Sequence, residues 1–174
     1  MTVRGWRSAA RVMVIALAAM GTADRAEAQF RSASAVSLSG GARMYDQGGN
    51  LAVSLRTEFP VGDLLAVEFS GSVADPVEGA ARSTASVLEA QLQLPVRLGE
   101  VLTPYAGAGI GFAKTYTGQN ADSRAQTVLS ASVGVRAGFS RELGLVADAR
   151  FRGIGGAWEG DHVDLTVGMR YQFR

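Results

Sequence analysis

Residues that could carry chemistry are few in this 174-residue chain, and its single histidine is the first candidate. His162 lies two residues before Asp164, so the two side chains share one face of an extended segment. A histidine held by a carboxylate can act as general base for a serine nucleophile, as in acyl hydrolases and acyl transferases. No serine lies two residues from His162, and Asp164 is an equally good partner for an arginine. We therefore predict no catalytic residues and a protein that is not an enzyme.

Two other patterns could indicate ligand binding. Gly107, Gly109 and Gly111 resemble a phosphate-binding loop in composition, but they do not open a helix and no acidic residue follows at the required distance. Alternate glycines in a strand instead favour close packing of backbones. Two pairs of acidic residues could supply oxygen ligands for calcium, namely Asp75 with Glu78 and Glu159 with Asp161. Solvated loop charge is the simpler interpretation, so we predict no cofactor and no metal site.

The N-terminus has the pattern of an export signal. A basic start is followed by a short apolar run and by small residues at the two positions that a signal peptidase reads: Arg4, Arg7 and Arg11, then 12–20, then Ala26 and Ala28. The apolar run is much shorter than the roughly 20 residues that a membrane-spanning helix needs. We predict a cleavable signal peptide over residues 1–28 and a single mature domain over 29–174.

The composition of the mature domain excludes several classes of protein. The chain has no cysteine, so it has neither a disulfide framework nor the cysteine of a lipoprotein. Outside the predicted signal peptide, about 13 basic and 14 acidic residues remain, which leaves the domain nearly neutral. A near-neutral domain gives no reason to expect a nucleic-acid partner.

Apolar and polar residues alternate with a period of two along the mature domain, which is the pattern of β-strands. Eight such segments can be distinguished: Ala35–Tyr45, Asn50–Phe59, Leu64–Ala74, Ser86–Leu98, Tyr105–Tyr116, Thr127–Phe139, Leu143–Arg152 and Val163–Phe173. Each is close to the 9 to 11 residues that a tilted strand needs to cross a bilayer. Eight is an even number, so both ends of the domain lie on the same side of the membrane.

The connections between these segments alternate in length. Short turns are expected at 60–63, 99–102 and 140–142, and longer polar or glycine-rich loops at 75–85, 117–126 and 153–161. Short periplasmic turns and longer outer loops are typical of outer-membrane barrels. The first outer connection, 46–49, is short, but Asp-Gln-Gly-Gly is suited to a hairpin turn.

The charged residues decide which face of the strands points inward. An arginine facing lipid at the centre of a bilayer costs about 2 to 4 kcal/mol. The interior of an eight-stranded barrel is just wide enough for side chains to fill, and opposite charges can pair there. We therefore predict an inward position for the charged residues of the polar face: Arg43, Arg56, Glu58, Glu68, Glu89, Arg97, Arg136, Asp148, Arg150, Asp164 and Arg170.

Aromatic residues favour a membrane barrel over a soluble one. They are expected as a band at each membrane surface, with Phe59, Phe139, Tyr171 and Phe173 on the periplasmic side and Tyr45, Phe112, Tyr116 and Phe151 on the outer side. A soluble, lipocalin-like barrel would use the same alternation with the apolar face inside, but it has no reason to band its aromatic residues.

Two motifs carry a resemblance to a known family. The last segment has the order polar, glycine, aromatic, aromatic at Thr166, Gly168, Tyr171 and Phe173, and the 104–112 segment reads Pro-Tyr-Ala-Gly-Ala-Gly-Ile-Gly-Phe. The whole mature domain resembles the small eight-stranded outer-membrane barrels of the outer-membrane protein X and outer-membrane protein A type. The resemblance implies an all-β fold, an eight-stranded antiparallel up-and-down transmembrane β-barrel preceded by a cleavable signal peptide, in the bacterial outer membrane.

The same resemblance implies partners and a role. In such proteins the terminal motif is read by the barrel-assembly machinery, so Thr166, Gly168, Tyr171 and Phe173 are expected to form that signal. A monomer with a structural or surface-interaction role is expected, with outer loops that contact lipopolysaccharide or other partners. Lys114, below Tyr116 on the lipid-facing side, could reach lipopolysaccharide phosphates together with Arg82 and Arg124. The alternatives are a lipid A-modifying barrel enzyme that uses His162, or a narrow pore.

Overall fold

The computed structural model describes residues 33–45, 48–62, 64–75, 82–96, 98, 101–117, 122–155 and 162–173. Within strands, it leaves the side chains of residues 82, 83, 85, 116, 117 and 122–124 undescribed. The predicted signal peptide, with Ala26 and Ala28, lies outside the described residues and stays a prediction. In the described part, no helix is long and apolar enough to cross a membrane.

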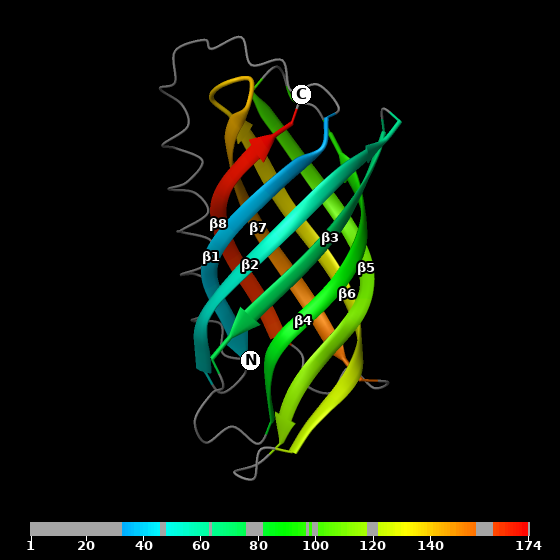
Figure 1. Cartoon of the computed structure of the whole chain (residues 1–174), viewed down its shortest axis with the longest axis vertical. Coiled ribbons are helices and arrows are strands. Elements are labelled where there is room, and N and C mark those ends of the chain that lie inside the picture. The colour runs from blue at the N-terminus through cyan, green and yellow to red at the C-terminus, as the bar shows by residue number, and fades with distance from the viewer. Residues whose placement is uncertain are drawn as a thin grey trace.

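The fold is a closed barrel of eight antiparallel strands in sequence order (Figure 1). The strands are β1 (Ala35–Tyr45), β2 (Gly48–Val61), β3 (Leu65–Ala74), β4 (Arg82–Pro95), β5 (Leu102–Thr117), β6 (Asp122–Gly138), β7 (Leu143–Ile154) and β8 (His162–Gln172). Each strand pairs with its neighbours in the chain, and β1 also pairs with β8. The predicted eight-stranded up-and-down barrel is therefore confirmed.

The strands differ from their predicted bounds mainly at the outer end. β4 begins at Arg82 and β6 at Asp122, so parts of two expected loops are strand. β5 and β6 extend past the neighbouring strands at the lower end of Figure 1. Beyond the membrane, both faces of a strand meet water, so no alternation marks the extension in the sequence. At the other end, β4 stops at Pro95, and the Leu98–Leu102 bridge forms the turn to β5.

The strand register determines the width of the interior. A path that starts at Ala35 and moves from each residue to its partner on the next strand reaches His162 on β8. His162 lies one residue before Val163, and Val163 pairs with Met44 of β1. The path therefore returns to β1 level with Tyr45, ten positions (45 − 35) from its start. Eight strands with this stagger are tilted by about 40° to the barrel axis and leave an interior that side chains can fill.

Burial alternates along the strands and places the polar face inside. Arg43 and Gln93 are completely buried, whereas Leu51 is 79% exposed and Leu88 is 68% exposed. Because the described part of the barrel encloses only a small apolar cluster, its exposed apolar belt must be covered by lipid. Ten of the eleven charged residues predicted to face inward do so, and Arg97 lies outside the described residues.

The alternate glycines of β5 allow side chains of β4 to occupy the interior. A Cβ atom on Gly109 would collide with the Ala90 carbonyl oxygen and with Cγ of Gln91. A Cβ atom on Gly111 would collide with the Leu88 carbonyl oxygen and with Glu89. The prediction that these glycines make room inside the barrel is confirmed.

Candidate functional site

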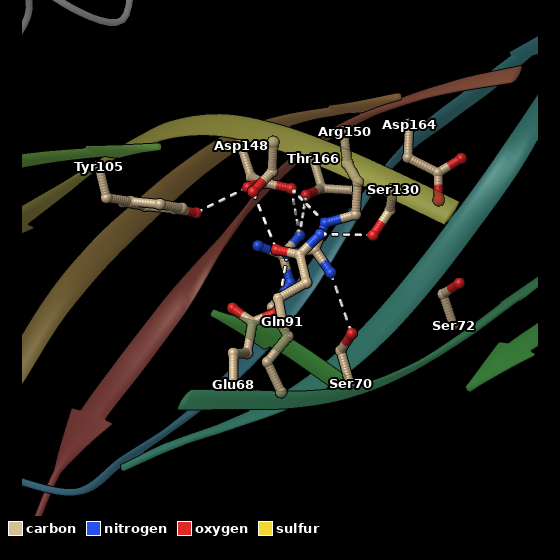
Figure 2. A network of polar contacts seen from close by, with 12 residues as sticks. Glu68, Ser70, Ser72, Gln91, Tyr105, Ser130, Asp148, Arg150, Asp164 and Thr166 are labelled. Atoms are coloured by element: carbon tan, nitrogen blue, oxygen red, sulfur yellow. Dashed lines mark hydrogen bonds and ion pairs between the residues drawn. The ribbon is translucent and has the colours of Figure 1, made fainter. Parts of the chain in front are cut away.

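The centre of the barrel is occupied by the side chain of Arg150, which projects from β7 across the interior (Figure 2). Its guanidinium forms ion pairs with Glu68 of β3 at 2.7 Å, with Glu89 of β4, and with Asp148 at 3.3 Å. It also donates to Ser70 Oγ at 3.0 Å. One arginine thus connects β7 to two strands on another part of the wall.

Two further arginines continue the network towards the outer end. Arg152 donates to Glu89 at 2.9 Å and also pairs with Asp164. Arg43 binds both oxygens of Asp164, at 2.9 and 3.0 Å. Glu89 and Asp164 are therefore each shared between two arginines, so neither carboxylate is left as an isolated buried charge.

The network also continues towards the periplasmic end. Asp148 pairs with Arg56 at 3.2 Å and accepts from the Tyr105 hydroxyl at 2.7 Å. At the end of the barrel, Glu58 lies between Arg136 at 3.0 Å and Arg170 at 3.4 Å.

Two glutamines link the charged groups to neutral ones. Gln91 donates to Ser130 at 2.8 Å and accepts from Ser132 at 2.9 Å. Gln93 donates to Glu68 at 2.8 Å and accepts from Arg136. The polar network therefore runs without interruption from Arg43 and Asp164 near the outer end to Arg170 near the periplasmic end.

Positive and negative charge in this interior nearly balance. Among the described residues the network contains six arginines and five carboxylates, namely Arg43, Arg56, Arg136, Arg150, Arg152 and Arg170 with Glu58, Glu68, Glu89, Asp148 and Asp164. An unpaired buried charge costs several kcal/mol, whereas a well-bonded pair recovers most of that cost. Paired arginines and carboxylates therefore line the described part of the interior.

The outer end contains a contact that the sequence did not predict. The β4–β5 pairing shifts between Thr84 and Ser86, which indicates a β-bulge. The backbone N–H of Thr84 donates to the Tyr45 hydroxyl at 3.0 Å, and the Thr84 carbonyl accepts from that hydroxyl at 3.2 Å and from Arg43 at 2.9 Å. β1 is thereby bonded to β4 across the interior.

Tyr45 was predicted to belong to the outer aromatic band, and this prediction is wrong. Its hydroxyl reaches Thr84, and its ring lies 5.4 Å from the ring of His162. The physical reason is strand parity, because Tyr45 shares the inward side of β1 with Arg43. The side chain of Tyr116 lies outside the description, whereas Phe112 is 66% exposed on the lipid-facing side.

His162 and Asp164 do lie on one face of β8, as the sequence indicates, but that face is the interior. His162 is 2% exposed, and its Nε2 atom lies 3.8 Å from Asp164. Asp164 is already bound by Arg43 and Arg152. The pair therefore belongs to the buried ionic network and does not face the surface at which a lipid substrate would lie.

A small apolar cluster also lies inside the outer half of the barrel. It consists of Val87, Ala113, Val128 and Ile154, one residue from each of β4 to β7. The sequence analysis missed it. The available signal was that Val87 and Val128 share the inward parity of Glu89 and Ser130.

The terminal motif is divided between the two faces of β8. Thr166 points inward and accepts from Arg56 at 2.5 Å. Tyr171 and Phe173 are exposed near the periplasmic end, with their rings 5.3 Å apart. Their exposure agrees with the predicted periplasmic aromatic band, and Phe59 and Phe139 are exposed as well. The role of the motif as an assembly signal stays a prediction.

Of the remaining candidates for ligand binding, the structure describes the side chains of Lys114 and Asp75, and both are exposed. Lys114 is exposed on the lipid-facing side of β5. Arg82 and Arg124 pair through their backbones with Thr117 and Thr115, and their side chains are not described. Of the acidic residues considered for calcium, Asp75 is exposed, and Glu78, Glu159 and Asp161 lie outside the described residues. The described residues contain no cluster of three or more metal-binding side chains.

Comparisons with known proteins agree with this architecture. A family model described as the outer membrane protein beta-barrel domain matches residues 10–173. Among solved structures, Neisserial surface protein A is similar with a TM-score of 0.63 at 13% identity, over 80% of this chain and 96% of that chain. The N-terminal β-barrel domain of Pseudomonas aeruginosa OprF gives a TM-score of 0.60 at 13% identity, over 80% and 97%. The outer membrane enzyme PagL gives 0.54 at 15% identity, over 80% and 99%. A search of curated proteins gave no match.

Proposed function

Because the chain belongs to the outer membrane protein beta-barrel domain family and so lies in the bacterial outer membrane, we propose that it is a closed, non-conducting barrel with a structural or surface-interaction role. Its outer surface would contact the lipids of the outer leaflet, lipopolysaccharide above all. The low identity of the similar structures, 13 to 15%, supports the fold but transfers no activity from them.

The observation that carries this proposal is the continuous polar network inside the barrel. Arg150 alone pairs with Glu68 and Glu89 on strands β3 and β4, and Arg43 and Tyr45 bond β1 to the bulge of β4. A water-filled pore needs a larger strand number or shorter interior side chains. Because paired arginines and carboxylates occupy the interior, the network supports a closed, non-conducting barrel better than a pore.

Electrical recording in planar bilayers tests this proposal. We expect no steady conductance from the folded protein. Folding is checked on the same sample by the altered gel mobility of the unboiled protein, since the closed hydrogen-bonded wall resists detergent. The triple variant Gln91→Ala/Arg150→Ala/Arg152→Ala is the positive control: it removes three large side chains from the lumen and should therefore conduct. A stable, reproducible channel in the wild-type protein would overturn the proposal in favour of a pore.

The alternative that the protein is a lipid A-modifying enzyme is tested separately. His162 is buried and Asp164 is occupied by arginines, so we expect the variant His162→Ala to leave lipid A unchanged in cells that overproduce the protein. Mass spectrometry of extracted lipid A measures the result. If the wild-type protein modifies lipid A and this variant does not, the result would favour an enzyme over a structural role.

A further inference from the structure

A groove of about 950 Å³ lies on the lipid-facing side of the barrel across β2 to β6. Two adjacent rows of residues that face one another across neighbouring strands line it. One row runs through Thr57, Phe69, Ala90, Ile110 and Leu129, and the next runs through Leu55, Gly71, Leu88, Phe112 and Thr127. The groove therefore crosses five strands, which is about 19 Å at the usual spacing of strands.

The groove is hollow because two neighbouring positions carry almost no side chain. Gly71 on β3 and Ala90 on β4 lie among large exposed residues, including Leu88 at 68% and Ile110 at 66% exposure. The ring of Phe69 packs edge-on against Phe59, 6.2 Å away, on the side opposite to Gly71 along β3. An apolar groove of this length and volume fits an extended hydrocarbon chain.

Ser86, Lys114 and Thr127 are polar residues of the lipid-facing side at the outer edge of this groove, whereas Thr57 lies in its periplasmic row. The next row of partners contains Lys114, paired with Ser86 of β4 and Ala125 of β6. Thr127 is exposed beside Phe112, in the row of the groove that lies nearer the outer end of the barrel. Among the lipid-facing strand positions whose side chains the structure describes, Lys114 is the only charged residue.

Lys114 lies three residues before the outer end of β5 at Thr117 and pairs with Ser86, next to the outer extension of β4. We therefore place it at the level where headgroups of the outer leaflet meet the hydrocarbon layer. A lysine at this depth extends its stem along the apolar surface and its amine towards the headgroups. An ammonium group there attracts a phosphate, which matches the phosphorylated headgroup of lipid A.

We infer that this face is a binding site for one lipopolysaccharide molecule, with an acyl chain of lipid A over Gly71 and Ala90 and a phosphate at Lys114. The inference rests on the proposed function, because it names the outer-leaflet lipid that the closed barrel contacts. Ser86, the partner of Lys114, and Thr127, the partner of Phe112, add two hydroxyl groups to this edge of the groove.

Native mass spectrometry of the folded protein from mixed micelles tests this site. Three lipids are compared: lipid A with both phosphates, lipid A without phosphates, and phosphatidylglycerol. We expect the wild-type protein to retain one molecule of phosphorylated lipid A in preference to the other two. Lys114→Gln should lower that retention about fivefold, to the level of the lipid without phosphates.

The groove is tested by filling it. Gly71→Leu and Ala90→Leu, made separately, should each reduce the retention of both forms of lipid A at least fivefold. A Cβ atom at position 71 would meet only the flexible end of Leu88 at 3.2 Å, so the barrel should still close. Gly40→Leu is the matched control, because Gly40 is exposed on β1, outside the groove, with nothing within 4 Å of an added Cβ atom.

Retention of lipid A by Ala90→Leu at the wild-type level, or an equal preference for phosphatidylglycerol, would overturn the site. Neither result would contradict the closed-barrel proposal, which is tested by the conductance measurement. A conducting wild-type barrel that still selects phosphorylated lipid A would reject the proposed function and leave the lipid site standing. Gel mobility of each unboiled variant confirms that only folded protein is compared.

Discussion

Removal of Arg150 should destabilise the barrel through the carboxylate that it leaves behind. Of its three ionic partners, Glu89 would keep Arg152 at 2.9 Å, and Asp148 would keep Arg56 at 3.2 Å and the Tyr105 hydroxyl at 2.7 Å. Among the described residues, Glu68 would keep only the neutral amide of Gln93 at 2.8 Å. The variant Arg150→Met therefore leaves one buried carboxylate without a cation.

Breaking a buried pair in this way typically costs about 3 to 5 kcal/mol, whereas replacing both partners by uncharged groups is often nearly neutral. We expect Arg150→Met to lower the free energy of unfolding by about that amount, and the second change Glu68→Gln to restore more than half of the loss. Urea titration of the protein refolded into lipid vesicles measures each value, with the folded fraction read from unboiled gels.

Arg141→Met serves as the control, because Arg141 is exposed in the turn before β7 and its loss should change stability by less than about 0.5 kcal/mol. The double-mutant cycle decides the matter. Either of two results would show that the reasoning about Glu68 is mistaken. Arg150→Met could lower the free energy of unfolding by less than about 1 kcal/mol, or the double variant could lose at least as much free energy as the two single variants together.

Two further predictions concern the closure of the barrel. Tyr45→Phe removes both hydrogen bonds between the Tyr45 hydroxyl and the backbone of Thr84, so it should lower the free energy of unfolding by about 1 to 3 kcal/mol in the same titration; an unchanged midpoint would show that the bulge does not need this contact. Gly41→Ala should prevent closure, because a Cβ atom there would overlap the carbonyl oxygen of Leu165 and lie 2.7 Å from Thr166 Cα, whereas Gly40→Ala, with open space around it, should fold normally. The unboiled gel compares the two glycine variants, and equal folding would contradict the close β1–β8 contact.

The alternation of residues was enough to predict the barrel, because a period of two assigns each side chain to one of two faces. Leu88, Glu89 and Leu92 could thus be placed correctly without coordinates. The same logic placed His162 and Asp164 together, and the preference of arginine for the interior indicated ion pairs.

Sequence alone could not predict which groups pair across the interior. Arg150 meets Glu68 and Glu89 only because of the register that accumulates around eight strands, and a change of two residues in one pairing would rearrange those partners. The bulge at Thr84 leaves no clear sequence signal either. The groove at Gly71 and Ala90 likewise depends on register, since these small residues become neighbours only when β3 and β4 pair as they do.

The central claim is that apolar side chains meet lipid while charged side chains fill the interior, and cysteine labelling tests it most directly. The chain has no cysteine, so single variants along β4 report one position each. In lipid vesicles, a carbene generated by photolysis of a lipid-soluble diazirine, which inserts into the neutral S–H bond, should label the cysteine of Leu88→Cys, Ala90→Cys and Leu92→Cys and leave that of Glu89→Cys, Gln91→Cys and Gln93→Cys unlabelled. Labelling of the second set in place of the first, or equal labelling of both, would contradict the account.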